Sequence, residues 1–430
     1  MRRLPRIASV CLALLAAAPL GAQRPATTRV PAVPAEHPRV RQALAALQAT
    51  NEWTLEQQAS ICEVPAPPFK EAARGAEYKR RLEALGLVNV RVDSVGNVIG
   101  ERPGTGQGPV VLISAHLDTV FPEGTDVTVK REGTVLTAPG IGDDCRGLAV
   151  LLAVARAMRD AQVATTGTVL FVGTVGEEGP GNLRGVRHLF ERELKDSIDY
   201  FISVDGTGLG VTSGAVGSHR YKVTYKGPGG HSYGAFGMPN PIHALGRAMA
   251  KVADLQVPRQ PRTTFSVGVI AGGTSVNSIA YEASMEVDMR SESEASLGEL
   301  DAKFQAAIRE ALTEERARWP NSRAALDLVV DTIGLRPAGT QPDSAPIVRV
   351  ALRARDLLTA GKQMVLPSGT NASSTDSNIP IALGIPAVTI DGGGQGRGGH
   401  SLNEAYNDGA MGWLGPQFAL LVVSALAGVR

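Results

Sequence analysis

The chain has 430 residues, 43% of them hydrophobic, and a formal net charge of +1. This length and apolar content are enough for one large domain and a smaller one. A charge so close to balance, with no basic stretch interleaved with aromatic residues, argues against a nucleic-acid partner.

The N-terminal segment has the pattern of a secretory signal peptide. Three arginines precede an apolar stretch over residues 7–18, and small residues follow it. We therefore expect residues 1–22 to be removed on export to the periplasm or the extracellular space. The Pro/Ala/Thr-rich residues 23–38 are expected to form a linker. No other run is long enough to cross a membrane, so we expect no stable membrane insertion.

Four near-continuous apolar runs predict the strands of a mostly parallel sheet that is covered on both faces. They span residues 110–113, 168–175, 200–204 and 387–390. In open α/β sheets, ligands bind beyond the carboxyl ends of the strands. Polar side chains follow the runs at that end, and we expect them to line one crevice: His116, Asp118, Glu177, Glu178, Asp205 and His400.

Asp143 adds a carboxylate just before an Ala/Leu/Val-rich helical stretch at residues 147–159. Carboxylates and imidazoles without thiolates suit zinc, manganese or cobalt. The charges favour two zinc ions, because Asp143, Glu178, Asp205 and a bridging hydroxide would balance them. A single ion would leave buried carboxylates unpaired, at a cost of several kcal/mol each. The sequence therefore predicts two divalent ions per chain.

Glu177 and Glu178 are consecutive residues that leave one strand, so their side chains point in different directions. One can bind a metal ion while the other faces the bound water. A metal ion lowers the pKa of that water toward neutrality, and a nearby carboxylate can pass its proton to a leaving amine. The predicted reaction is metal-assisted hydrolysis of an amide.

A second domain interrupts the first. The pattern changes near Gly214 to alternating strands and amphipathic helices. Strands are expected at 221–225, 264–270, 283–289 and 326–330, and helices at 241–253 and 297–318. This order is the split βαβ arrangement of ferredoxin-like domains. We therefore place the α/β catalytic domain at 39–213 and 335–430, and an inserted α+β domain at 214–334.

Two cysteines lie beyond the expected leader, Cys62 and Cys145. Export permits a disulfide, but two cysteines do not make a disulfide framework. Their spacing matches no zinc-finger pattern. We expect free buried thiols.

Six short motifs occur in order along the chain: Ser114-Ala115-His116-Leu117-Asp118-Thr119, Gly142-Asp143-Asp144, Gly176-Glu177-Glu178-Gly179, Val204-Asp205-Gly206, Gly230-His231-Ser232 and Gly399-His400-Ser401. Together they resemble the co-catalytic zinc exopeptidase family that includes peptidase T, glutamate carboxypeptidase and the aminoacylases. The resemblance extends from about Val40 to the C-terminus. The motif around Asp205 is more similar to peptidase T than to relatives with glutamate there.

The resemblance implies two zinc ions per subunit, for which cobalt or manganese could substitute. The implied metal ligands are His116, Asp143, Glu178, Asp205 and His400. Asp143 would bridge the two ions, and the pairing of Glu178 and Asp205 with each ion stays open. Asp118 would support His116, and Glu177 would be the general base.

In the insert, the resemblance implies that His231 reaches the active site of a neighbouring subunit and stabilises an oxyanion. Asn277 and Arg290 resemble positions that hold the substrate carboxylate, for which arginine is well suited. A surface ion pair is the alternative for Arg290. The chain departs from the family at Cys145 and Arg146, where many relatives have lysine and glycine.

These features predict an exported di-zinc exopeptidase that acts on short peptides, as a tripeptide aminopeptidase or dipeptidase does, and that dimerises through its insert. An N-acyl-amino-acid amidohydrolase or a carboxypeptidase is the alternative among hydrolases. A catalytically silent peptide- or metal-binding protein is the alternative from another class, but such a protein needs no general base. The Gly-rich loop at 392–399 lacks the context of a phosphate cradle and favours close approach of a substrate to the backbone.

Overall fold

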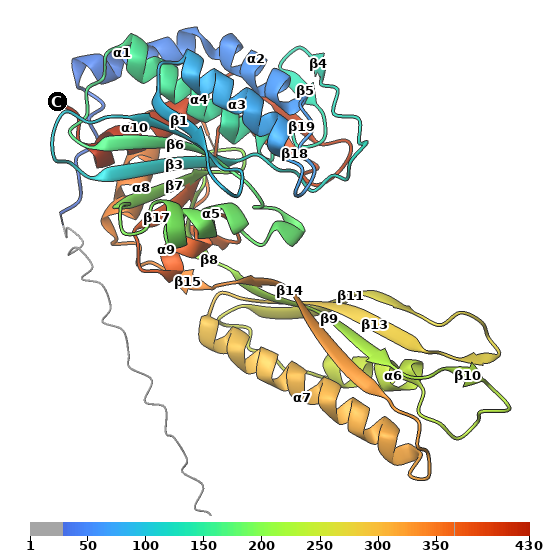
Figure 1. The fold of residues 1–430 in the computed structure, drawn as a ribbon. Coiled ribbons are helices and arrows are strands. Elements are labelled where there is room, and N and C mark those ends of the chain that lie inside the picture. Colours follow the sequence, from blue (N-terminus) through green and yellow to red (C-terminus); the bar gives the residue numbers. More distant parts are fainter. Residues whose placement is uncertain (1–28, 365) are drawn as a thin grey trace, which may run out of the picture.

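The computed structural model describes residues 29–364 and 366–430. The expected signal peptide lies outside these residues, as does the first part of the expected linker. A larger α/β lobe and a smaller lobe with its own sheet adjoin each other (Figure 1). Within the described part of the chain, no helix is both long and apolar enough to cross a membrane.

Among the described residues, the larger sheet has nine strands, and its centre is parallel, as predicted. Its order is β1-β2-β6-β3-β7-β17-β8-β15, with β16 paired to β8. The parallel centre consists of β6 (Thr168–Thr174), β3 (Val110–His116), β7 (Tyr200–Val204) and β17 (Ala387–Ile390). The outer strands are β1 (Val88–Val92), β2 (Val98–Arg102), β8 (Val211–Ala215), β15 (Gly339–Thr340) and β16 (Asn371–Ser373). The carboxyl ends of the central strands share one edge, where the residues after them meet.

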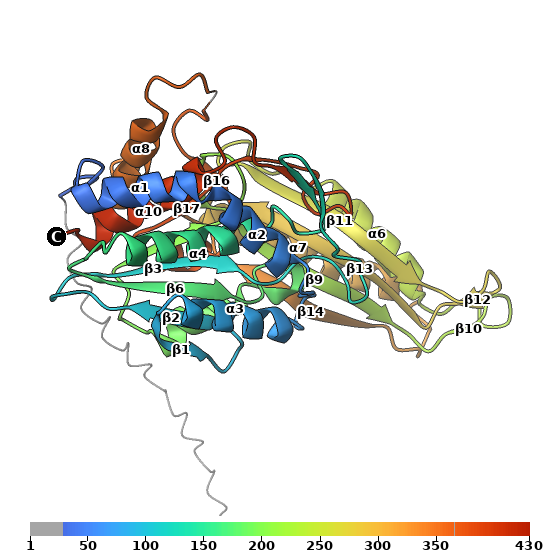
Figure 2. The same cartoon turned by 90° about the horizontal axis from the view of Figure 1, so that it is seen from above.

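Helices cover both faces of this sheet, which explains why its central strands are apolar throughout. In β3, Val111 and Ile113 pack into one core, and Leu112, on the opposite face, packs into another. The first layer contains α1 (Pro38–Ala49), α2 (Asn51–Cys62), α3 (Ala72–Ala84), α4 (Cys145–Asp160), α8 (Pro346–Thr359) and α10 (Leu414–Ala427), several of which are visible above the sheet in Figure 2. The second layer contains α5 (Arg184–His188), α9 (Asn378–Ala382) and the π-helical turn at Leu189–Glu193.

A small antiparallel sheet connects two segments that carry predicted ligands. It consists of β18 (Gln395–Arg397), β19 (Ala405–Asn407), β5 (Val135–Thr137) and β4 (Lys130–Glu132). Because β19 pairs with β5, the loop that carries His400 lies beside the segment that leads to Asp143.

The insert forms the predicted split βαβ domain. Its sheet has the order β11-β13-β9-β14 and is antiparallel. Its elements are β9 (Gly217–Lys226), β10 (Gly230–His231), α6 (Pro241–Ala253), β11 (Thr263–Gly272), β12 (Ser278–Ile279), β13 (Glu282–Ser291), α7 (Glu294–Arg318) and β14 (Asp327–Arg336). Both helices pack on one face of the sheet, since Ala248 of α6 and Phe304 of α7 share a core with Val223 and Met285. The chain connects to the larger lobe at these strands, since β8 directly precedes β9 and β15 directly follows β14.

The expectation of free thiols is wrong. A disulfide joins Cys62, the last residue of α2, to Cys145, the first residue of α4, with their Cα atoms 5.4 Å apart. Both residues are fully buried. The two cysteines are 83 positions apart in the sequence, and they meet only because α2 packs against α4.

Candidate metal centre and active site

The structure brings all five predicted metal ligands together at the carboxyl edge of the sheet. They form two groups of three: His116, Asp143 and Asp205 in one, and Asp143, Glu178 and His400 in the other. Within each group, one ligand atom from each residue lies within 4.8 Å of the others. Asp143 belongs to both groups, as the bridging role requires.

The two oxygens of Asp143 face different imidazoles. Oδ1 lies 2.9 Å from Nε2 of His116, and Oδ2 lies 3.2 Å from Nε2 of His400. The same His400 nitrogen is 3.0 Å from Oε1 of Glu178. The geometry therefore pairs Glu178 with His400 and Asp205 with His116, a choice that the sequence left open.

The loop that carries Asp143 is held by two neighbouring carboxylates. Asp144 caps α4 by accepting the N–H of Gly147 at 2.9 Å, and it also accepts the N–H of His116 at 3.0 Å. Glu404 accepts the N–H groups of Gly142 and Asp143 at 2.7 and 3.0 Å. Glu404 was not predicted from the sequence, where its only signal is its place four residues after His400.

Asp118 supports His116, as the resemblance implied, and also the two glutamates. Its backbone carbonyl oxygen, rather than its carboxylate, lies 3.0 Å from Nδ1 of His116. This contact suits a tautomer that leaves Nε2 of His116 free for a metal ion. The Asp118 carboxylate instead accepts the N–H groups of Glu177 and Glu178 at 3.1 and 2.8 Å. It thereby fixes the backbone of both glutamates.

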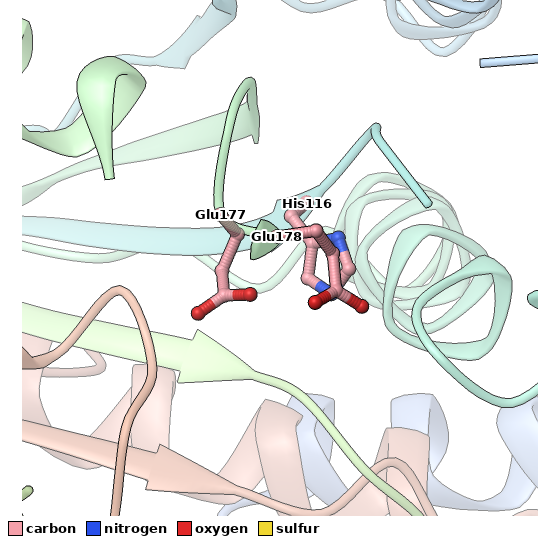
Figure 3. Close-up of side chains that lie close together, drawn as sticks. All are labelled: His116, Glu177 and Glu178. Atoms are coloured by element: carbon pink, nitrogen blue, oxygen red, sulfur yellow. The ribbon is translucent and has the colours of Figure 1, made fainter. Parts of the chain in front are cut away.

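The two glutamates leave their loop in different directions, and Glu178 lies next to His116 while Glu177 points elsewhere (Figure 3). Oε1 of Glu177 lies 3.2 Å from Nη1 of Arg336, and Nη2 of the same arginine donates to the backbone carbonyl of Glu177. Burial raises the pKa of Glu177 to about 8, although Arg336 opposes this shift. Arg336 ends β14, and no motif in the sequence indicated its role.

The charges of the site favour bound cations. Burial, and then the carboxylates of Asp143 and Asp144, raise the pKa of Asp205 well above its ordinary value. Hydrogen bonds to Asp143 and Glu178 raise the pKa of His400 to about 10. Buried carboxylates are costly unless cations balance them. Two imidazoles and three carboxylates without a thiolate fit zinc, manganese or cobalt.

A cavity of about 630 Å³ opens beside these ligands, between the two lobes. The insert contributes Arg220 and Arg290, and both guanidinium groups bind Asp288 through Nε, at 2.9 and 2.7 Å. Arg290 therefore forms the expected ion pair and also lines the cavity, and its role in holding a substrate carboxylate stays a prediction. Arg220, which matches no motif, is a second cation in the same wall.

His231 and Asn277 lie elsewhere, at the tip of the insert. They neighbour each other, because β10 pairs with β12 and the N–H of Ser232 donates to the backbone carbonyl of Asn277 at 2.9 Å. Both are exposed, and neither lines the cavity. The strands that hold them are at the far end of the insert from the parallel sheet (Figure 2). Within one chain, the structure does not bring His231 to the metal ligands.

The two residues that depart from the family pattern face away from the cavity. Cys145 forms the disulfide, and Arg146 is fully buried. Its guanidinium donates to the carbonyl groups of Gly392 and Gly412, at 2.7 and 2.8 Å. These two glycines lie at the two ends of the segment that carries His400, so Arg146 holds the two ends of that segment together.

Comparisons with known proteins agree with this arrangement. The family model described as peptidase family M20/M25/M40 matches residues 112–412. The uncharacterized protein YqjE of Bacillus subtilis (strain 168) is 24% identical over 356 residues, which cover 78% of this chain and 89% of that protein. Aminopeptidase PepT from Bacillus cereus ATCC 10987 has a similar fold, with a TM-score of 0.67 and 21% identity over 87% of this chain and 98% of PepT.

A second solved structure with this fold is the Bacillus subtilis YXEP protein, a dinuclear metal binding peptidase. It aligns with a TM-score of 0.60 and 20% identity, over 88% of this chain and 99% of YXEP. The family match covers well over half of the sequence and includes every residue of the two metal groups. The chain is therefore a metallopeptidase that belongs to the peptidase family M20/M25/M40.

Proposed function

We propose that this protein is an exported exopeptidase that uses two zinc ions to hydrolyse the amide bonds of short peptides. The observation that carries the proposal is the pair of three-ligand groups that share Asp143, with Glu177 beside them. PepT, which has this fold, is an aminopeptidase, and this supports peptides as substrates. The Cys62–Cys145 disulfide fits an oxidising compartment and supports export.

The residues of the site divide the work of hydrolysis. Bound metal ions would polarise the substrate carbonyl and lower the pKa of a water molecule. Glu177 takes a proton from that water at its carboxylate and delivers it to the leaving amine. Arg336 and Asp118 hold Glu177 in place through side-chain and backbone contacts. Arg290 binds the substrate carboxylate from the wall of the insert.

We further propose a homodimer that forms through the insert. His231 sits among exposed apolar side chains, including Tyr233, Phe236 and Val276, and such a surface is typical of a protein interface. Nδ1 of His231 accepts the N–H of Tyr233 at 3.2 Å. The proton of the neutral ring is then on Nε2, which is free to donate to an oxyanion in the partner's site.

The test uses purified protein without residues 1–22. We expect two zinc ions per chain by elemental analysis, and cleavage of free tripeptides and dipeptides. Asp143→Ala should lower the occupancy of both ions, because Asp143 belongs to both ligand groups, whereas the exposed Asp126→Asn should leave two. One ion or none in folded wild-type protein would contradict the two-metal site. Cleavage of N-acetyl amino acids alone would favour the amidohydrolase alternative.

A further inference from the structure

Asp391 brings into the cavity a carboxylate that the metal centre does not use. It directly follows β17 and begins the Gly-rich loop, and its side chain is half-buried in the cavity wall. The other acids of the cavity already have a role, since Asp143, Glu178 and Asp205 belong to the two metal groups and Glu177 is the proposed base. Asp391 belongs to none of these groups, so its presence in the cavity needs a different explanation.

Within the described part of the chain, Asp391 also has no cationic partner. Its Oδ2 accepts one hydrogen bond, from the N–H of Gly210 at 2.6 Å. Across residues 29–364 and 366–430, no lysine, arginine or histidine forms an ion pair with it, and Oδ1 has no hydrogen-bond donor. Burial raises the pKa of Asp391 to about 6, with only that one backbone hydrogen bond in opposition. Carboxylates shielded from water are usually paired with a cation, so this one is suited to a cation from outside the chain.

Three alternate glycines keep space around the carboxylate. A Cβ atom at Gly206, Gly208 or Gly210 would lie 3.2, 2.9 or 2.8 Å from an oxygen of Asp391. Gly206 and Gly208 have positive φ angles, but Gly210 does not. At Gly210, therefore, the nearness of the carboxylate is what excludes a side chain. The glycines after β7 thus leave room for the Asp391 carboxylate. The first of them, Gly206, directly follows the metal ligand Asp205.

We propose that Asp391 binds the free α-ammonium group of the substrate, so that the enzyme selects peptides with an unblocked N-terminus. This inference rests on the proposed function, since it assigns one part of the peptide to a place in the same cavity. An ammonium group offers N–H donors and a charge that a carboxylate binds strongly. In an aminopeptidase substrate, this group is two bonds from the scissile carbonyl carbon, which suits a carboxylate that lines the same cavity as the metal ligands. Arg220 and Arg290, from the insert, line the same cavity and suit the carboxylate of a peptide.

The test compares two peptides that differ only at the N-terminus, Ala-Ala-Ala and N-acetyl-Ala-Ala-Ala. We expect wild-type kcat/KM to be at least tenfold higher for the free peptide. Asp391→Asn keeps the shape but removes the charge, and loss of a hydrogen bond to a charged group typically costs roughly tenfold to a hundredfold. We expect kcat/KM for the free peptide to fall by this factor, while kcat/KM for the acetylated peptide changes by about twofold or less. Gly210→Ala should act in the same direction, by displacing the carboxylate.

Asp126→Asn, in an exposed loop, is the matched control and should change neither rate. Elemental analysis should find the wild-type metal content in Asp391→Asn. Equal losses on both peptides, or an unchanged preference, would overturn the role of Asp391 and leave the proposed exopeptidase standing. If wild-type protein cleaves neither peptide, the proposed function fails instead. In that case, calorimetry would measure the binding of the same two peptides. Equal affinity for the free and the acetylated peptide would contradict an ammonium-binding role for Asp391.

Discussion

Glu177 is held by three contacts to two residues, Asp118 and Arg336. Its N–H donates to Asp118, its backbone carbonyl accepts from Arg336, and its carboxylate contacts the same guanidinium. The neighbouring Glu178 shares the contact with Asp118 but turns toward His400. Adjacent carboxylates of identical chemistry are therefore separated in role by backbone geometry and by one arginine.

At this scale we expect Glu177→Gln to separate catalysis from metal binding. Glutamine keeps the size and the hydrogen bonding of the side chain but cannot accept the proton. We expect turnover of a free tripeptide to fall by roughly a hundredfold or more, the usual scale for loss of a general base, with both metal ions retained. Exposed Glu191→Gln is the control and should have wild-type activity. Near-normal turnover in Glu177→Gln would assign the proton transfer to another group.

At the scale of elements, the N-terminal end of α4 connects several segments that form the site. This end carries the Asp144 cap, the disulfide to α2, and Arg146, which binds both ends of the segment from Gly392 to Gly412. Asp408, in the same segment, lies 4.0 Å from Arg146 and accepts hydrogen bonds from Asn51 and Tyr406. One helix end therefore positions ligands that come from both sides of the insert.

Removal of the disulfide should weaken the attachment of α2 to the N-terminal end of α4. In the double variant Cys62→Ala, Cys145→Ala, we expect the free energy of unfolding to fall by about 2–4 kcal/mol, the typical contribution of a native disulfide. Metal affinity should fall as well, because Asp143 lies two residues from Cys145. Denaturant unfolding and metal titration of wild-type and variant protein measure the two effects, with reduced wild-type protein as a second comparison. Equal stability of the two proteins would mean that packing alone holds α2 against α4.

At the scale of the whole molecule, the predicted catalytic groups are divided between two places. The metal ligands lie at the edge of the parallel sheet, and His231 lies at the tip of the insert (Figures 1 and 2). His231 can contribute to hydrolysis only from another subunit or after a large movement of the insert. The exposed apolar side chains around it favour the first arrangement.

Mixing two inactive proteins distinguishes these arrangements. We expect His231→Ala to bind metal normally but to hydrolyse peptides about a hundredfold to a thousandfold more slowly, as for loss of one oxyanion donor. If His231 acts across the interface, mixed dimers of Glu177→Gln and His231→Ala contain one complete site and regain activity. His243→Ala, an exposed histidine of the same insert, is the control and should be active by itself. No recovery after verified subunit exchange would favour closure within one chain.

The sequence predicts the parts of this molecule that local pattern determines. The strands at the centre of the sheet are apolar throughout because both faces are buried, and α6 begins where predicted because Asn240 caps it and Pro241 starts it. The place of the site was predictable because His116, Glu178 and Asp205 lie at or just after strand ends, and the resemblance to the zinc exopeptidases implied the full set of ligands. Glu404, Arg336 and the Cys62–Cys145 disulfide were not, because each acts through a contact between segments far apart in the chain. Tertiary packing alone creates such contacts.

The segment from Asp143 to Arg146 also restricts how this protein can evolve. Its four side chains contact His116, Cys62 and the backbone of Gly392, which lie in three other segments of the chain, so replacement of any one removes a contact. Replacement of Cys145 and Arg146 by the lysine and glycine of many relatives would leave Cys62 without its disulfide partner. It would also leave Asp408 without its nearby guanidinium. Substitutions at contacting positions are not additive in their effects on stability. Lineages that carry this pair of residues are therefore expected to change Cys145 together with Cys62, and Arg146 together with Asp408, rather than one position at a time.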